Sequence, residues 1–169
     1  MKPIVSLFWR ICIFRAGPES VPLNGTLTTV IIVLNALVNI SVPLLLGGGT
    51  ETVLRAVTAT FVSLAGTAAL VWFVMMLMSL TERFAQTITA VIAVDIILTL
   101  IAAVLFSLVG DLTNTLSVFV TALLVSWTLA VYGFIFHRAM DMHIGLGVVM
   151  ALFVFIFTMA ITQTALGGA

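Results

Sequence analysis

Long apolar stretches separated by short polar ones dominate the pattern of this chain. Five of the stretches reach the roughly 20 residues that a helix needs to cross the hydrocarbon core of a bilayer. These predicted spans are residues 27–46, 56–80, 87–109, 116–136 and 144–165. Because the connections are short, each span should pack antiparallel to the next one along the chain. The pattern therefore predicts an all-α integral membrane protein, with a five-transmembrane-helix bundle over residues 26–169.

The first 25 residues have a different pattern. Lys2, Ser6 and Arg10 recur every four residues, and most positions between them are apolar. This spacing predicts an amphipathic interfacial helix that lies in the headgroup boundary of the membrane, followed by a linker that contains proline. A helix packed against the bundle would show the same spacing. Arg10 and Arg15 interrupt the apolar run, so we expect this segment to be retained rather than cleaved as a signal peptide.

Composition supports the membrane assignment and excludes several classes of protein. Of 169 residues, 63% are hydrophobic and 7% are charged, with a mean hydropathy of +1.37. The net charge is zero and no basic stripe is present, so we expect no nucleic-acid partner. The one cysteine stands apart from any Cys/His pattern of metal ligands, so we expect no metal and no cofactor. Catalytic motifs such as GxSxG, Walker A and HExxH are absent from the sequence, which predicts a protein that is not an enzyme.

The basic residues predict the orientation of the chain. Under five spans Arg55 alone falls on one side of the membrane, and the other side carries Lys2, Arg10, Arg15, Arg83 and Arg138. An excess of Lys and Arg marks the cytoplasmic side. We therefore expect a multi-pass protein of the bacterial inner membrane with a cytoplasmic N-terminus and a periplasmic C-terminus. Contacts with membrane lipids at the interface are expected from Lys2, Trp9, Arg10, Arg15, His137 and Arg138.

The third span carries an acid, Asp95, about eight residues from its cytoplasmic end, or roughly 12 Å at the rise of a helix. An ionised carboxylate at such a depth costs at least ~2.5 kcal/mol, and such groups usually face the interior of a bundle. Asn35 and Asn39 lie at a similar depth and one helical turn apart in the first span. Depth alone predicts an intramembrane polar layer formed by Asp95, Asn35, Asn39, Thr99, Ser126 and Thr128.

This layer has two main interpretations. In the structural one, Asp95 is protonated and hydrogen-bonded to an amide, and it contributes only to assembly. In the functional one, Asp95 is a site for a proton or a cation. Contact with a partner subunit is a third option. A smaller feature lies in the second span, where Ala59, Ser63 and Thr67 recur beside Gly66 and predict a face for close helix packing.

Three segments together resemble a known group of proteins. They are FRAGPESVP after the N-terminal helix, RFAQTITA at the start of the third span, and WTLAVYGFIFHRAMD at the end of the fourth. The chain resembles small bacterial inner-membrane proteins with five spans, which are distantly similar to the Yip1 family. The resemblance implies a five-helix bundle with a cytoplasmic N-terminus. Eukaryotic members of that family act as non-enzymatic partners in membrane trafficking and bind small GTPases through long N-terminal regions, which residues 1–25 do not resemble.

These observations predict a non-catalytic membrane protein that works by association. We expect an accessory, assembly or scaffolding subunit of an inner-membrane complex, which contacts other integral membrane subunits or further copies of itself. The alternative is a small oligomeric channel or carrier that uses the polar layer around Asp95. Lipid binding through the N-terminal helix and the HRAMDMH segment is a third hypothesis.

Overall fold

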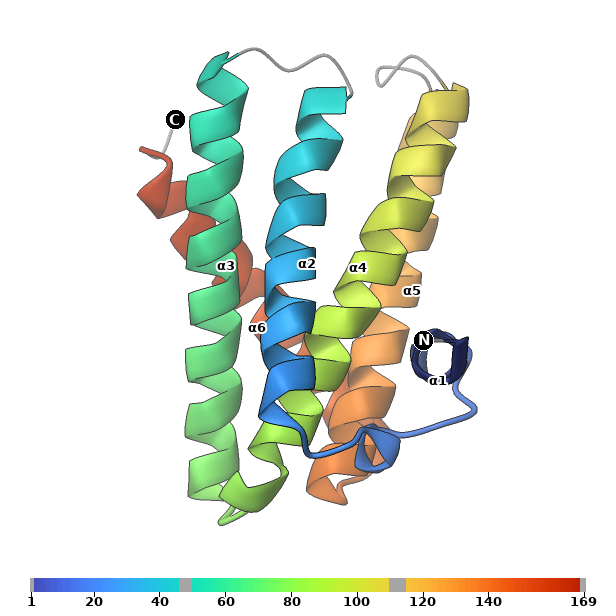
Figure 1. Ribbon diagram of the computed structural model, residues 1–169, viewed down its shortest axis with the longest axis vertical. Coiled ribbons are helices and arrows are strands. Elements are labelled where there is room, and N and C mark those ends of the chain that lie inside the picture. Colours follow the sequence, from blue (N-terminus) through green and yellow to red (C-terminus); the bar gives the residue numbers. More distant parts are fainter. Residues whose placement is uncertain (1, 46–49, 110–114, 168–169) are drawn as a thin grey trace.

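A computed structural model describes residues 2–45, 50–109 and 115–167, and these residues form helices without strands. The elements are α1 (Lys2–Cys12), η1 (Pro18–Ser20), α2 (Gly25–Leu45), α3 (Thr50–Leu77), η2 (Thr81–Arg83), α4 (Phe84–Val109), α5 (Thr115–Met140) and α6 (Ile144–Ala165). Within the described part of the chain, five helices are long and apolar enough to cross a membrane, namely α2 to α6 (Figure 1). The prediction of an all-helical, multi-pass membrane protein is confirmed at this level.

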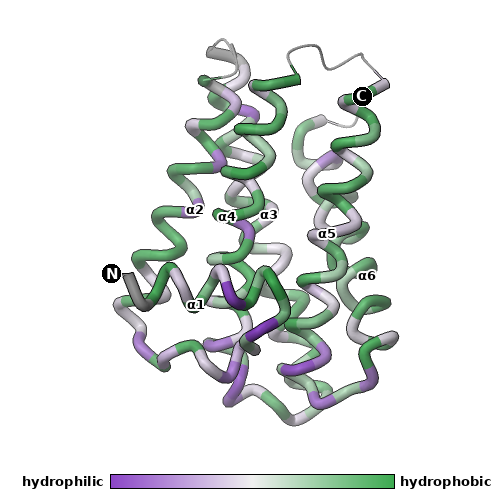
Figure 2. Tube along the Cα trace, turned by 90° about the vertical axis from the view of Figure 1, so that its right-hand side faces the viewer, coloured by the Kyte–Doolittle hydropathy of each residue, from purple (hydrophilic) through white to green (hydrophobic). Residues whose placement is uncertain are grey.

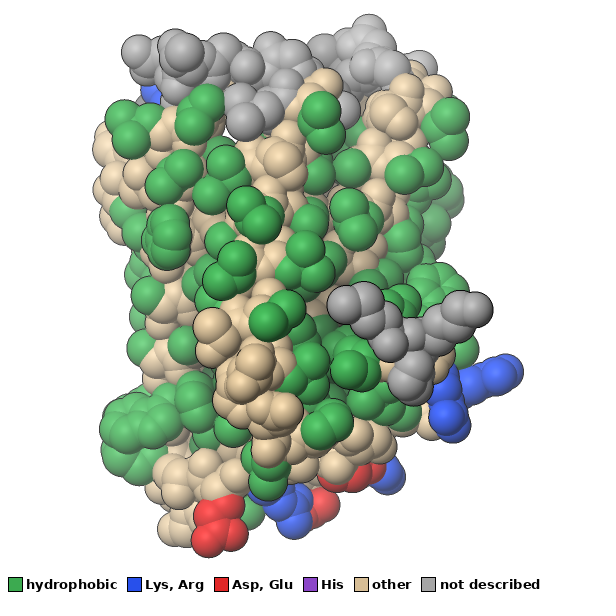
Figure 3. Space-filling view, in the orientation of Figure 1, with side chains coloured by type: hydrophobic (Ala, Val, Ile, Leu, Met, Phe, Trp, Pro, Cys, Tyr) green, Lys and Arg blue, Asp and Glu red, His purple; other side chains and the backbone are tan. Residues whose placement is uncertain are grey.

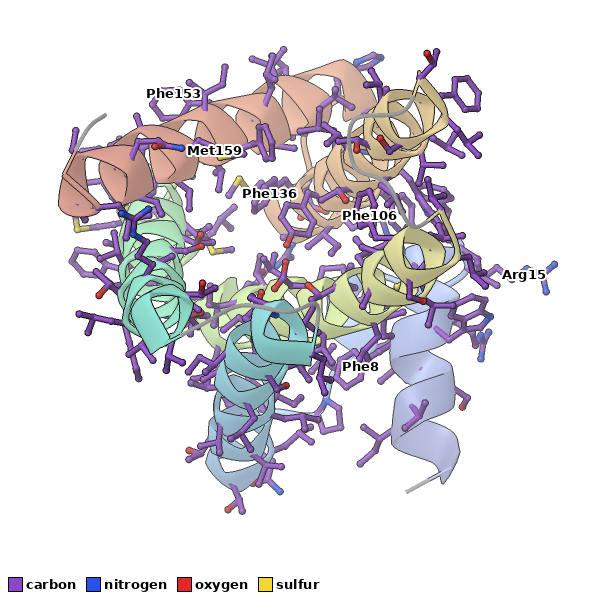
Figure 4. All side chains as sticks on the ribbon, turned by 90° about the horizontal axis from the view of Figure 1, so that it is seen from above. Phe8, Arg15, Phe106, Phe136, Phe153 and Met159 are labelled. Carbon is purple, nitrogen blue, oxygen red and sulfur yellow. The ribbon has the colours of Figure 1, made fainter. Side chains whose placement is uncertain are left out.

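The five long helices form a closed ring. Around the ring the order is α2, α3, α6, α5 and α4, and each helix packs against the next one. Figure 4 shows this ring along its axis, with a space in the middle that side chains enter from all sides. The ring order differs from the chain order because α4 packs mainly against α2 and only slightly against α3, so α6 lies next to α3 instead. The expectation that each span packs beside the next one is therefore wrong for α3 and α4.

Two glycines bring α5 and α6 into close contact near the end of the bundle where α1 lies (Figure 1). We call this end the α1 end. A Cβ atom on Gly147 would press against the carbonyl oxygen of Gly133 and lie 2.9 Å from the backbone nitrogen of His137. A Cβ on Gly133 would lie 3.0 Å from the Cα of Val148. The two backbones can approach this closely only because both positions lack a side chain.

Away from this contact, α5 and α6 diverge. In Figure 1, α6 runs obliquely behind the bundle and ends behind α3, whereas the far end of α5 stays behind α4. The ring is therefore narrow at the α1 end and wide at the opposite end. The narrow end is filled by side chains with no exposed surface, which are Val71, Met75, Val131, Ile135 and Phe136.

α1 lies across the outside of α4 and α5, roughly perpendicular to them (Figures 1 and 2). Phe8, Ile11 and Cys12 are buried in this contact. The indole Nε1 of Trp127 in α5 donates a hydrogen bond of 3.2 Å to the carbonyl oxygen of Cys12. Of the two arrangements that the sequence allows, the structure thus shows packing against the bundle. A position in the headgroup boundary stays a prediction.

The outer surface is apolar over most of its height. Figure 3 shows hydrophobic side chains spread over the helices and charged side chains gathered mainly at the α1 end. Exposed residues include Phe61, Leu77, Leu108, Phe119 and Val149, each at least half exposed. Such a surface is unfavourable in water and suits contact with lipid acyl chains.

We predict that Gly147→Ala lowers stability by roughly 1–3 kcal/mol, because the added methyl group must displace backbone atoms of α5. Thermal unfolding of the purified protein in detergent would measure this. Gly145→Ala is the matched control in the same helix, since its Cβ would meet only the His143 side chain at an ordinary distance of 3.4 Å. Equal melting temperatures for the two variants would contradict the close α5–α6 contact.

We also predict that Cys12 resists thiol reagents in the folded protein. Burial raises the pKa of the Cys12 thiol to about 11, outweighing the backbone hydrogen bond that lowers it, so the thiol stays neutral well above pH 7. Only the thiolate reacts readily. Maleimide labelling should be slow in membranes and fast after denaturation, and Phe8→Ala, which loosens α1, should accelerate it. Rapid labelling of the unmodified protein would mean that α1 is not docked on the bundle.

Candidate functional site

Asp95 lies in α4 and faces two other helices of the ring. From α2, the side-chain nitrogens of Asn35 and Asn39 lie 2.8 Å and 3.2 Å from Oδ2 of Asp95. From α5, the hydroxyl of Tyr132 lies 3.2 Å from Oδ1. The carboxyl group thus joins three helices through hydrogen bonds on both of its oxygens.

The orientation of the two amides follows from their other contacts. Nδ2 of Asn35 also lies 3.3 Å from the carbonyl oxygen of Ile92, and Nδ2 of Asn39 lies 3.1 Å from the carbonyl oxygen of Asn35. A carbonyl oxygen can only accept a hydrogen bond, so both amides turn their NH₂ groups toward Asp95. The amides therefore favour a carboxylate. The Tyr132 hydroxyl can donate to a carboxylate or accept from a protonated acid, so the site accommodates both forms.

A polar stripe on α2 builds this contact. Thr28, Asn35 and Asn39 are separated by seven and four residues, which places them on one face of the helix. That face packs on α4, where the hydroxyls of Thr28 and Thr89 lie 2.8 Å apart. Asn35 is only 2% exposed. The hydrogen bonds between α2 and α4 fix their register and bring both asparagines to the level of Asp95.

A cavity of about 400 Å³ begins at Asp95. Its walls come from all five long helices, and its polar lining consists of Asn35, Asn39, Thr60, Ser63, Thr67, Asp95, Thr128, Tyr132, Thr158 and Thr162. The lining residues of α3 and α6 lie toward the wide end of the ring, so the cavity extends from Asp95 away from α1. Met159 and Phe136 point into the central space, whereas Phe153 points outward (Figure 4).

Hydroxyl groups line the wall opposite Asp95. Those of Thr67 in α3 and Thr158 in α6 lie 3.3 Å apart, and Thr60 donates to the carbonyl oxygen of Ala56. The hydroxyl oxygen of Thr162 is buried and has no hydrogen-bond partner among the described residues. The face of α3 that the sequence marks for helix packing thus also lines the cavity.

The structure brings together part of the predicted polar layer. Asp95, Asn35, Asn39 and Thr128 all line the cavity. Ser126 is exposed and donates to the carbonyl oxygen of Ala122 in its own helix, so it lies outside the layer. Two residues along a helix differ by about 200° in direction, so Ser126 and Thr128 cannot both face inward. Thr99 is half-buried and is not among the residues that line the cavity.

The predicted interface residues lie in different environments. Trp9, Arg10 and Arg15 are exposed, and Arg15 points away from the bundle (Figure 4). Arg138 is exposed and forms an ion pair with Glu19. His137 is half-buried, with Nδ1 against the carbonyl oxygen of Met142. The side chain of Lys2 lies outside the described part of the structure.

Tyr132 is a residue of the candidate site that counting depth along the helices misses. It comes one turn after Thr128, or about 6 Å further along the axis of α5. Side chains on a helix lean toward its N-terminus, so the long tyrosine reaches back to the level of Thr128 and Asp95. The length of the side chain, rather than the position of the Cα atom, is the signal that identifies it.

Comparison of the chain with protein-family models, with curated proteins and with solved structures finds no match in any of the three. The resemblance to five-span bacterial proteins and to the Yip1 family therefore stays a prediction.

We predict that Asp95→Ala lowers stability by roughly 1–3 kcal/mol, because it leaves the amides of Asn35 and Asn39 and the Tyr132 hydroxyl without their acceptor. Thr99→Ala, one turn further along α4, is the matched control and should have a much smaller effect. Melting temperatures of the purified variants in detergent provide the test. A larger loss for Thr99→Ala would show that the Asp95 hydrogen bonds contribute little to the bundle.

Proposed function

We propose that this protein is a small, non-catalytic membrane carrier that binds an organic cation in the cavity next to Asp95. The observation that carries the proposal is the position of this carboxyl group, which is held by three side chains at the closed end of a cavity. A carboxylate accepts about four hydrogen bonds, so one direction remains for a ligand.

The lining of the cavity supports a particular class of ligand. Asp95 is the one charged residue among the described side chains that line it. Leu64, Val154, Phe155 and Met159 supply apolar surface beside the polar groups. Sites of this kind bind molecules that have an apolar body and few polar groups. A small alkyl or aryl ammonium ion would place its charge at Asp95 and its hydrocarbon part against the apolar wall.

The shape of the ring favours a carrier over a channel. A channel needs a continuous path, but side chains of Val71, Met75, Val131, Ile135 and Phe136 fill the ring at the α1 end. An intramembrane site that is reached from one side at a time is the arrangement that alternating access requires. With the N-terminus in the cytoplasm of a bacterial cell, the wide end would face the periplasm.

The cost of an unpaired charge supports a cationic ligand. An ionised carboxylate without a counter-ion is unfavourable at this depth. A bound cation supplies that counter-charge at Asp95.

The accessory or assembly role that the sequence favours stays a prediction. Affinity purification from mild detergent followed by mass spectrometry tests it, and recovery of one stoichiometric membrane partner would support it. A chain that repeatedly purifies alone would count against it.

We predict that proteoliposomes containing this protein take up benzylguanidinium along an imposed gradient, because this organic cation stays charged at neutral pH and has N–H groups that can donate to Asp95. Uptake of the radiolabelled compound measures the rate. Asp95→Asn should reduce the rate by more than about tenfold, because the counter-charge is lost. Glu82→Gln removes an exposed carboxylate outside the cavity and should leave the rate unchanged.

A second readout does not depend on turnover. Ser63 lines the cavity and is only partly buried, so Ser63→Cys places an accessible thiol there, whereas Cys12 is buried and should not interfere. A polar thiol reagent should modify the new cysteine, and the cation should protect it. If Ser63→Cys stays unreactive, or if Asp95→Asn transports the cation as fast as the unmodified protein, the proposed carrier function is wrong.

A further inference from the structure

A second cavity, of about 460 Å³, lies at the opposite end of the bundle from the opening of the first. It is formed by η1, by η2 and the first turn of α4, and by the end of α5 with the turn that follows. We call it the interface pocket, and its lining residues are Pro18, Glu19, Arg83, Gln86, Thr87, His137, Arg138, Ala139, Asp141 and Met142. Its volume is in the range of ligand sites.

The interface pocket contains charges of both signs. Nη1 of Arg83 lies 2.6 Å from Oδ2 of Asp141 and donates to the carbonyl oxygen of Ala139. Arg138 donates through Nε and Nη2 to Oε1 of Glu19. A guanidinium ion carries five N–H groups and a carboxylate has two oxygens, so each pair retains donors and acceptors for a ligand. The pocket therefore suits a molecule that itself carries both charges.

The pocket adjoins an apolar surface. The ring of Phe14, just after α1, meets the ring of Phe134 edge to face at a centroid distance of 5.5 Å. Phe134 in turn lies 6.5 Å from the ring of His137, which lines the pocket. Phe14 is 46% exposed. An aromatic strip thus leads from the exposed ring of Phe14 to the charged groups.

We propose that the interface pocket binds the headgroup of phosphatidylethanolamine. The phosphate lies between Arg83 and Arg138, where planar guanidinium groups recognise it by charge-assisted hydrogen bonds. The ammonium group lies against the free carboxylate oxygens of Glu19 and Asp141. One acyl chain follows the strip formed by Phe14 and Phe134. The pocket is separated from the Asp95 cavity by the packed end of the ring, so this proposal does not depend on the carrier function.

Native mass spectrometry of the delipidated full-length protein tests the proposal, with each lipid added separately at equal concentration. Phosphatidylethanolamine should bind more than phosphatidylglycerol, which lacks the ammonium group, and more than phosphatidylcholine, whose quaternary nitrogen cannot donate. We expect a preference of roughly two- to fivefold, the size of effect for partly exposed ion pairs. Glycerophosphoethanolamine has the same headgroup without acyl chains and should bind far more weakly. Equal binding of that soluble compound would assign the pocket to a free phosphoester and overturn the lipid proposal.

Single substitutions distinguish the proposed contacts with the phosphate from those with the ammonium group. Arg83→Gln and Arg138→Gln should weaken all three phospholipids, because each removes a phosphate donor. Glu19→Gln breaks the same ion pair as Arg138→Gln but retains the guanidinium, so it should reduce only the preference for phosphatidylethanolamine. Arg55→Gln, on the other side of the bundle, is the control for loss of one positive charge. If it weakens binding as much as the pocket variants, or if Glu19→Gln and Arg138→Gln behave alike, the assigned geometry is wrong.

Discussion

The high cost of a lone carboxyl group in hydrocarbon governs the arrangement of this bundle. Asp95 avoids that cost by accepting hydrogen bonds from α2 and α5, so three of the five long helices have a defined depth relative to one another. The remaining helices can then be packed by shape. Hydrogen bonds of this kind are worth roughly 0.6–2 kcal/mol each in a membrane, so their main effect is to select one register among many similar apolar packings.

The same interaction explains why the interior is not filled. Side chains that hydrogen-bond to Asp95 must stop at its level, and small residues with hydroxyl groups continue the wall beyond it on α3 and α6. Ala56, Ala59 and Ser63 take up little volume, and α6 diverges from α5 on that side. A polar group at the narrow end and small side chains at the wide end together produce a one-sided cavity. The charged residues are mostly at the other end, where the second pocket lies.

Much of the fold could be predicted from the sequence, because hydropathy alone identifies spans. The fifth span, residues 144–165, has the same limits as α6. Other ends were less accurate, since hydropathy reports polarity and not backbone conformation. α5 continues through His137 and Arg138 to Met140 and ends where Asp141 adopts a positive φ of 50°. A non-glycine residue in this conformation gives no clear signal in the sequence.

The candidate site was partly predictable for a similar reason. Counting residues along straight helices gives the depth of Asn35, Asn39 and Asp95, and the structure places these three side chains together. Counting does not give the direction of a side chain around its helix or its reach. Ser126 therefore turned out to face outward, and Tyr132 turned out to reach Asp95. The order of helices around the ring, which creates the cavity, depends on the contact of α6 with α3 and has no local signal.

The glycine contact between α5 and α6 has a mechanical consequence. α5 and α6 converge near Gly133 and Gly147 and diverge from there like the arms of a V. At the rise of a helix, about 27 Å of α6 extends beyond Gly147. A rotation of about 10° at such a vertex would displace the far end of α6 by roughly 5 Å. The length of α6 amplifies any change of angle at this contact, so the two glycines that fix the angle between α5 and α6 also determine the width of the cavity mouth.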